Sequence, residues 1–378
     1  MIKWFLKYGF VIYLLNTILL SIEKTFVLGY NIFLLLMLCF SFALLINLDK
    51  VKEVLFQKPF RFLLFLSFLN ITYWFIFHQI NEVDSLKYLL ARTMQFMIIP
   101  FAIFFNYNYF KSKFLYHLVY VLFLVVFIGL ILDPYIFDIR YSGLVWNPNI
   151  LSSISCLGFA TLFLSSKKLT KFDRFILLIF IVTALSTGSR SVLFAIALAF
   201  LFKHGFSYRN TIYAFISILI YFIVLNFDVS TSINRFDAQS LFNDRLLQYK
   251  YAYETFLQKP FFGFGLDKYA YINQDIVPSY LSTHIISAHN AYLAIIVQYG
   301  IIFGLLFLGV IFYKILEIFN NINLKESVER YYLYIITYVV IASFYETLIT
   351  GINEIHTILF WFSLSFLSYI IYNRIHEN

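Results

Sequence analysis

Residues 114–132 have the sequence FLYHLVYVLFLVVFIGLIL, which contains no Asp, Glu, Lys or Arg. A helix needs about 20 mostly apolar residues to cross the hydrocarbon layer of a bilayer, because the layer is ~30 Å thick and each residue adds ~1.5 Å. This stretch meets both requirements. Similar runs occupy much of the chain, so the fold is decided by membrane spans.

The composition of the whole chain supports the same conclusion. Of its 378 residues, 61% are hydrophobic and 13% are charged, with a mean hydropathy of +0.81. A soluble domain has roughly 25% charged residues. We therefore predict an all-α, polytopic membrane bundle and exclude a soluble globular enzyme.

Twelve apolar runs are expected to be transmembrane helices, so that both termini lie on one side. Lys3 and Lys7 precede the first run without a small-residue cleavage site, which predicts an uncleaved first span. Gly188-Ser189-Arg190 divides a longer segment into two short halves that can be tilted or re-entrant. The expected spans are 8–22, 26–47, 60–80, 86–106, 114–132, 149–165, 173–187, 189–203, 210–227, 290–313, 331–351 and 355–372.

The positions of Lys and Arg set the expected orientation. With both termini in the cytoplasm, most of the 28 Lys and Arg residues fall in cytoplasmic segments, as the positive-inside rule requires. The chain then divides into nine spans over 1–227, one long extracytoplasmic loop over 228–289, and three spans over 290–378.

Other partners and cofactors are not indicated. The net charge of +8 comes from residues scattered through short loops, which does not favour nucleic acid. Cys39 and Cys156 lie inside apolar runs without Cys or His at metal-ligand spacing, so we expect no disulfide, no metal site and no cofactor.

The long loop is expected to contain an amphipathic helix over the membrane surface. Asn243 or Asp244 can cap it, and Pro260 ends it. Gly263 and Gly265 then predict a flexible turn. The apolar positions of this helix recur every three or four residues: Leu246, Tyr249, Tyr253, Phe256 and Leu257.

Charged groups at the outer ends of spans are functional candidates, because they are costly to place in lipid. In the predicted topology they gather on the outer side, which predicts a site facing outward. They are Arg92, Arg190, Asp228, Arg235, Arg245, His289, Glu346, Glu354 and His356.

Each local pattern also has a structural interpretation. The turn Ser186-Thr187-Gly188-Ser189-Arg190-Ser191 can hold phosphate oxygens, or it can be a tight turn with a snorkelling arginine. The loop helix with Arg245 can be amphipathic with a solvated polar face. His289 can act as a base, or it can be a hydrogen-bonded helix-start residue. Arg92 and Glu346 can neutralise each other or other buried charges.

The order of the motifs resembles the O-antigen polymerase and O-antigen ligase family. Thr-Gly-Ser-Arg-Ser is followed by Asp-Arg-Leu, Lys-Pro-Phe-Phe-Gly-Phe-Gly-Leu-Asp-Lys-Tyr, and His-Asn-Ala-Tyr-Leu with Gly300 eleven residues after the His. Asn147-Pro148-Asn149 resembles the family's Asn-Pro-Asn. The resemblance covers 147–304, and it departs from the family at Gly304, which lies one residue late.

The resemblance implies a membrane glycosyltransferase whose donor is a glycan on undecaprenyl diphosphate. Arg190 and Arg245 would hold the diphosphate, with Ser189 and Arg235 as further expected contacts, and His289 would lie beside the reacting hydroxyl. Arg92, Glu346 and Glu354 are expected supporting residues. No Asp-X-Asp pair or His cluster is present to hold a metal, so arginines would stabilise the leaving group.

The expected function is polymerisation of lipid-linked repeat units on the periplasmic face of a bacterial inner membrane, metal-independent and with inversion. Its expected partners are the lipid-linked oligosaccharide, the lipid bilayer and a chain-length regulator. The alternative is the ligase, which transfers the polysaccharide to the lipid A core. A transporter or flippase of lipid-linked sugars is less favoured, because the charges lie beside one outer loop and not around the midplane.

Overall fold

The computed structural model describes residues 2–79, 82–136, 140–189, 191–225, 240–267 and 289–376. In these ranges the regular structure is helical throughout. The elements are α1 (Ile2–Leu20), η1 (Glu23–Thr25), α2 (Phe26–Ile46), α3 (Leu48–Leu55), α4 (Arg61–Phe77), α5 (Val83–Ser112), α6 (Phe114–Leu132), α7 (Pro148–Phe163), α8 (Lys171–Ser186), α9 (Ser191–His204), α10 (Tyr208–Leu225), α11 (Ser240–Gln258), α12 (Ala291–Asn321), α13 (Ser327–Ala342) and α14 (Ile355–His376).

The helical fold predicted from the sequence is confirmed, since each of the twelve expected spans contains a helix. Helices suit lipid because they satisfy every backbone donor and acceptor internally. Among the described residues, five helices are long and apolar enough to cross a membrane: Glu23–Ile46, Val83–Ser112, Phe114–Leu132, Ala291–Asn321 and Ile355–His376. The number of twelve spans stays a prediction.

Helix α14 lies at the centre of the bundle, and 94% of its most apolar 18-residue stretch is buried. It packs against α1, α5, α12 and α13. Phe362 stacks on Phe10 of α1 at 4.4 Å, and Trp361 meets Phe96 of α5 edge-on at 4.8 Å. By contrast, only 28% of the most apolar stretch of Glu23–Ile46 is buried. Helix α2, which makes up most of this segment, exposes large apolar side chains, as a lipid-facing helix should.

Two helix boundaries differ from the expected spans. The span expected over 331–351 ends at Ala342, and residues 343–354 form an irregular segment. We call it the outer turn, and the end of the bundle that it shares with α11 the outer end, after the side on which the sequence predicts them. The polar residues of the outer turn include Glu346 and Asn353. The span expected over 290–313 extends to Asn321 and is broken at Gly300, where φ is 65°.

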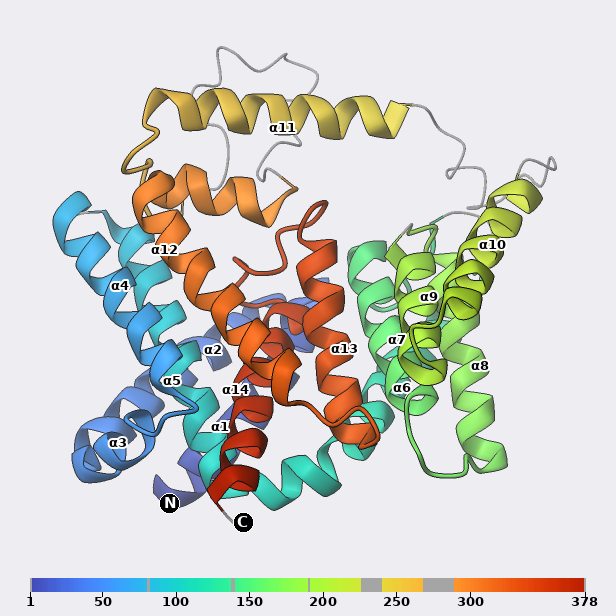
Figure 1. Ribbon diagram of the computed structural model, residues 1–378, viewed down its shortest axis with the longest axis horizontal. Coiled ribbons are helices and arrows are strands. Elements are labelled where there is room, and N and C mark those ends of the chain that lie inside the picture. The colour runs from blue at the N-terminus through green and yellow to red at the C-terminus, as the bar shows by residue number, and fades with distance from the viewer. Residues whose placement is uncertain are drawn as a thin grey trace.

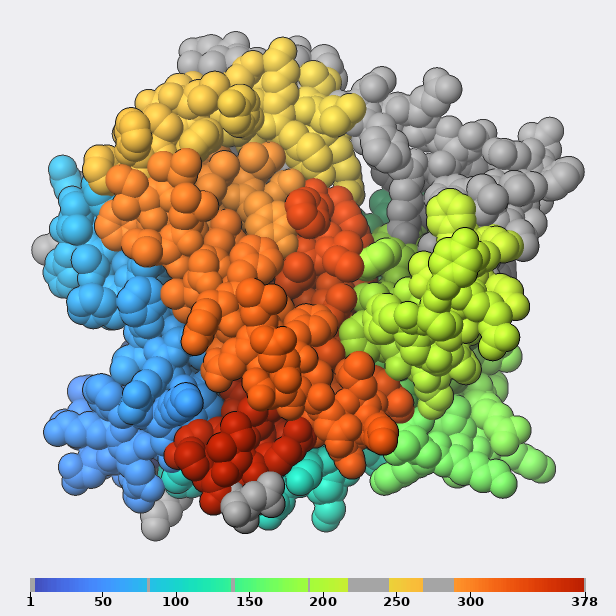
Figure 2. All heavy atoms as spheres, viewed as in Figure 1, coloured from blue at the N-terminus to red at the C-terminus, as the bar shows by residue number. Residues whose placement is uncertain are grey.

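Helix α11 lies across one end of the bundle, over the first part of α12, while both ends of the chain lie at the opposite end (Figure 1). In the space-filling view α11 and α12 form a continuous surface there (Figure 2). Because the described helix already includes Ser240, Asn243 and Asp244 lie within it, and the expected cap there is wrong.

The face that α11 buries also differs from the expected apolar stripe. Gln248, Ala252 and Thr255 are its buried residues, and Ala252 packs on Ala294 and Val297 of α12. The predicted apolar positions Leu246, Tyr253 and Leu257 are more than half exposed. The small Ala252 allows the close approach of the two helices, and Phe256 packs against the same contact. Of the five expected apolar positions, three therefore face outward and two are partly buried.

Candidate functional site

The segment that follows α11 is docked on the break in α12, and we call this contact the joint. Phe264 and Gly265 donate backbone hydrogen bonds to the carbonyl oxygens of Val297 and Gln298, at 2.9 Å each. Ile301 donates to the carbonyl oxygen of Pro260 at 2.8 Å. The break exposes carbonyl and N–H groups of α12, and the segment satisfies them.

Glycines make this close approach of two backbones possible. A Cβ atom on Gly263 would lie 2.3 Å from the Gln298 carbonyl oxygen, and one on Gly300 would lie 2.4 Å from the Phe261 carbonyl group. Both glycines have positive φ angles, which residues with a Cβ rarely adopt. The turn expected at Gly263 and Gly265 is present, and it is docked on α12, while its flexibility stays a prediction.

Helix α4 supports the joint from a third side. The Tyr73 hydroxyl lies 2.6 Å from the carbonyl oxygens of both Phe262 and Gln298. The backbone N–H of Leu266 donates to Nε2 of His78 at 2.9 Å.

The His-Asn-Ala-Tyr-Leu motif begins α12 and is attached to the outer turn. The Asn290 side chain caps the helix by accepting from the N–H groups of Tyr292 and Leu293, at 3.0 Å each. The N–H of Ala291 donates to the Ser343 carbonyl oxygen at 2.9 Å. His289, just before this cap, has a φ of 43°, a conformation that is uncommon without glycine and is found at functional sites.

Glu346 of the outer turn lies between Arg245 and His289. Arg245 Nη2 is 3.2 Å from Glu346 Oε1, and Arg245 Nη1 donates to the Tyr345 carbonyl oxygen at 2.9 Å. His289 Nδ1 is 3.4 Å from Glu346 Oε2. All three side chains are partly exposed, so this ion cluster is open to a ligand. The structure thus brings together two predicted catalytic residues through a predicted supporting residue.

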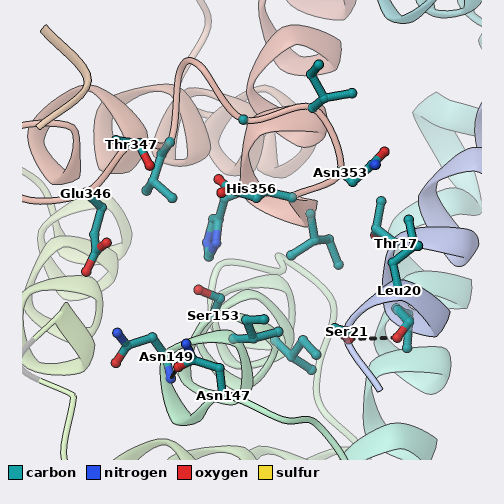
Figure 3. Close-up of a pocket in the computed structure, with 18 of the residues that line it drawn as sticks. Thr17, Leu20, Ser21, Asn147, Asn149, Ser153, Glu346, Thr347, Asn353 and His356 are labelled. Carbon is teal, nitrogen blue, oxygen red and sulfur yellow. Dashed lines mark hydrogen bonds between the residues drawn. The ribbon is translucent and has the colours of Figure 1, made fainter. Parts of the chain in front are cut away.

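A cavity of about 710 Å³ opens beside this cluster. Its walls come from α1, α2, α7, the start of α9, the outer turn and the start of α14. Figure 3 shows His356 of α14 projecting across the open space toward Asn149 and Ser153 of α7, with Glu346 to one side. His289 and Glu354 also line the cavity.

The Asn-Pro-Asn motif is built into this cavity. Asn147 caps α7 by accepting from the N–H of Asn149 at 2.8 Å, and Pro148 occupies the first turn. Arg140 Nη2 donates to Asn149 Oδ1 at 2.7 Å, and Arg140 Nε donates to the Thr187 carbonyl oxygen at 3.1 Å. Arg140 therefore ties the motif to the Gly-Ser turn. The sequence did not single out Arg140, because its partners lie on separate segments.

The Gly-Ser turn borders the same cavity. Gly188 has a φ of 62°, and the hydroxyl oxygens of Ser189 and Ser191 are 2.7 Å apart. Ser191 lines the cavity, whereas Ser189 is buried. Arg190 and Arg235 lie outside the described residues, so their expected diphosphate contacts stay predictions.

Arg92 does not pair with Glu346, so the expectation that these two neutralise each other is wrong. Arg92 is buried, and it donates to the carbonyl oxygen of Thr350 in the outer turn and to Gln95 Oε1 at 2.7 Å. Its guanidinium lies 5.5 Å from the ring centre of Tyr88. It therefore supports the outer turn from beneath.

Glu354 lies at the end of the outer turn and faces the cavity. Its carboxylate accepts a hydrogen bond from the Thr357 hydroxyl at 3.2 Å. The surrounding protein atoms desolvate this carboxyl group and raise its pKa from 4.5 to about 7, although the side chain is exposed to the cavity. Such a group can take up or release a proton near neutral pH. The described residues contain no group of three His, Cys, Asp or Glu side chains that could hold a metal ion.

Apolar helices, a basic and acidic cluster at one end, and an adjoining cavity with polar groups in its wall indicate a helical membrane protein with a candidate site at that end. Residues 175–309 match the family model described as O-Antigen ligase. The match confirms the resemblance to the O-antigen ligase and polymerase family, whose members are membrane glycosyltransferase-like enzymes acting on lipid-linked oligosaccharides. No curated protein matches the chain.

Proposed function

We propose that the protein is a surface-polysaccharide polymerase. It would transfer a growing glycan from undecaprenyl diphosphate onto a new lipid-linked repeat unit, at the periplasmic face of a bacterial inner membrane. The observation that carries this proposal is the cluster of Arg245, His289 and Glu346 at the edge of the cavity. The motifs of the matched family segment supply the first two of these residues.

The chemistry assigned to the cluster is displacement of a diphosphate. A hydroxyl group of the acceptor sugar attacks the anomeric carbon of the donor, and the bond from that carbon to the diphosphate oxygen breaks. Arg245 and Arg190 stabilise the charge that develops on the leaving diphosphate. Attack from the opposite face inverts the anomeric configuration.

His289 accepts the proton of the attacking hydroxyl in this proposal. Glu346, 3.4 Å from the His289 ring, then stabilises the positive charge that the imidazole acquires. The diphosphate replaces Glu346 as the partner of Arg245, because both offer oxygens to the same guanidinium.

The ligase is the second candidate, since the matched family model is described as O-Antigen ligase. Both enzymes release undecaprenyl diphosphate and differ in the acceptor. A chain-length regulator would be a partner of the polymerase only.

Deletion of the gene from a Gram-negative host separates the two. Without the polymerase, an intact ligase attaches single repeat units, so a lipopolysaccharide gel should show core plus one unit and no ladder. Bare core, with polymer accumulating on undecaprenyl diphosphate, would identify the ligase. Repeat units accumulating on the cytoplasmic face would contradict both and indicate a flippase.

A further inference from the structure

The cavity contains polar groups that the described part of the protein leaves without partners. The Ser153 hydroxyl, the side-chain nitrogen of Asn149 and the ring nitrogens of His356 make no hydrogen bond to described residues, and the buried Oδ1 atom of Asn353 also lacks a partner there. His356 and the Asn353 oxygen are buried, whereas Asn149 and Ser153 are half-buried and face the open space. Polar groups withdrawn from water are costly without hydrogen bonds, so their gathering around one cavity indicates a ligand that bonds to them.

The charges around the cavity restrict the chemistry of that ligand. Glu346 and Glu354 line it, and its described lining contains no Lys or Arg. Next to these two carboxylates an anion would be repelled, so we place the diphosphate at the edge, where Arg245 lies. A prenyl chain would suit the apolar lining but not the wall of Asn149, Ser153 and His356, because hydrocarbon would leave these polar groups unsatisfied.

A sugar ring meets both conditions. Its hydroxyl groups donate and accept hydrogen bonds, as amide, hydroxyl, imidazole and carboxylate groups require. Its C–H faces suit the apolar side of the cavity, which Leu20, Phe26 and Trp146 form. The volume of about 710 Å³ is in the range of roughly 300–1,000 Å³ that ligand pockets occupy.

We infer that the wall formed by Asn149, Ser153 and His356 binds a sugar ring of the lipid-linked glycan through the hydroxyl groups of that ring. This inference rests on the proposed function, and it adds the place where the glycan is recognised. The diphosphate lies at the Arg245 edge, and the sugar joined to it extends into the cavity past His289.

Two probes separate recognition of the sugar from recognition of the lipid diphosphate. They are undecaprenyl diphosphate and the same lipid carrying one repeat unit, extracted from the host with this gene deleted. Binding of each to the purified full-length protein in detergent is measured by thermophoresis. We expect the glycolipid to bind more tightly than the bare lipid, and Ser153→Ala and His356→Phe each to weaken glycolipid binding roughly three- to tenfold. Binding of bare lipid should stay unchanged.

Ser155→Ala is the matched control, because Ser155 lies on the same helix and its hydroxyl also lacks a partner, but it faces the packed core. It should leave both affinities unchanged. Glycolipid binding that is unaffected by Ser153→Ala, in protein with a wild-type melting temperature, would overturn the sugar site and leave the proposed function standing. Wild-type protein that binds neither lipid would overturn the proposed function itself.

Discussion

In α14 the hydroxyl groups of Ser363, Ser365 and Ser368 each donate to a carbonyl oxygen four residues earlier in the same helix, at 2.6, 2.9 and 2.6 Å. The Ser153 hydroxyl in α7 has no partner within the described residues and faces the cavity. The core around α14 thus satisfies these polar groups locally, while the outer end presents polar groups to an open space. A missing partner is not sufficient to mark a site, since Ser155 lacks one inside the packed core. The combination with a cavity distinguishes the outer end.

The largest expected effect is at the charged edge of the outer end. Arg245→Ala should lower turnover on lipid-linked substrate at least a hundredfold, because a lost charge-assisted contact to a developing phosphate charge costs about 3 kcal/mol. Arg245→Lys should recover little of this loss, since a point charge does not replace the planar fork. Near-normal turnover of a stably folded Arg245→Ala variant would show that this end is structural, as the core is.

The joint should be the next most sensitive feature. Gly300→Ala places a Cβ atom 2.4 Å from backbone atoms of Phe261, so we expect a local cost of about 2 kcal/mol or more. Limited proteolysis should then cleave near α11 faster while the melting temperature of the core changes little. Gly309→Ala is the control on the same helix, where a Cβ atom meets nothing within 4 Å. If both variants resist protease equally, the joint does not hold α11.

The outer turn should respond to pH in a way that the core does not. The pKa of Glu354 is about 7 in the folded protein, against 4.5 as its ordinary value, so the unfolded state gains stability from ionisation as the pH rises through this window. Glu354→Gln removes that effect. The melting temperature of the variant should equal that of the wild type below pH 4.5 and exceed it above pH 7. The corresponding gain in the free energy of unfolding should be only about 1 kcal/mol, because exposure to the cavity screens the charge. A difference that is independent of pH would contradict the raised pKa.

The smallest effect compares two serines directly. Ser363→Ala should lower the free energy of unfolding by ~0.5–1 kcal/mol, because it removes a hydrogen bond within the core. Ser153→Ala should leave it unchanged, since no bond to described residues is lost. Thermal melts in one detergent measure both, and equal losses would remove the contrast between the two regions.

The sequence predicted the helices well because lipid imposes a simple rule on length and polarity. It failed where that rule does not apply. The expected span over 331–351 included the outer turn, since Tyr345, Leu348 and Ile349 keep its hydropathy high around Glu346. The break at Gly300 was missed because glycine is common in membrane helices.

The candidate site was predicted as a set of residue types and not as an arrangement. The motifs indicated Arg245 and His289, but their meeting at Glu346 joins positions 101 and 57 residues apart. The cavity wall was only partly visible: Asn149 came from the Asn-Pro-Asn motif, whereas Ser153 has no sequence signal of its own. Long-range contacts of this kind depend on helix packing, which hydropathy does not encode.

The joint at Gly300 can also be considered as the pivot of a lever. Gln258 lies thirteen positions after Arg245 in α11, which gives an arm of roughly 20 Å at ~1.5 Å per residue. A rotation of about 5° at the pivot would move the guanidinium by nearly 2 Å, and a misplacement of ~1 Å can cost a hundredfold in rate. Backbone hydrogen bonds on both sides of the pivot limit that rotation. The angular stiffness of a glycine-rich contact at one end of α11 thus determines the positional accuracy of the arginine near the other end.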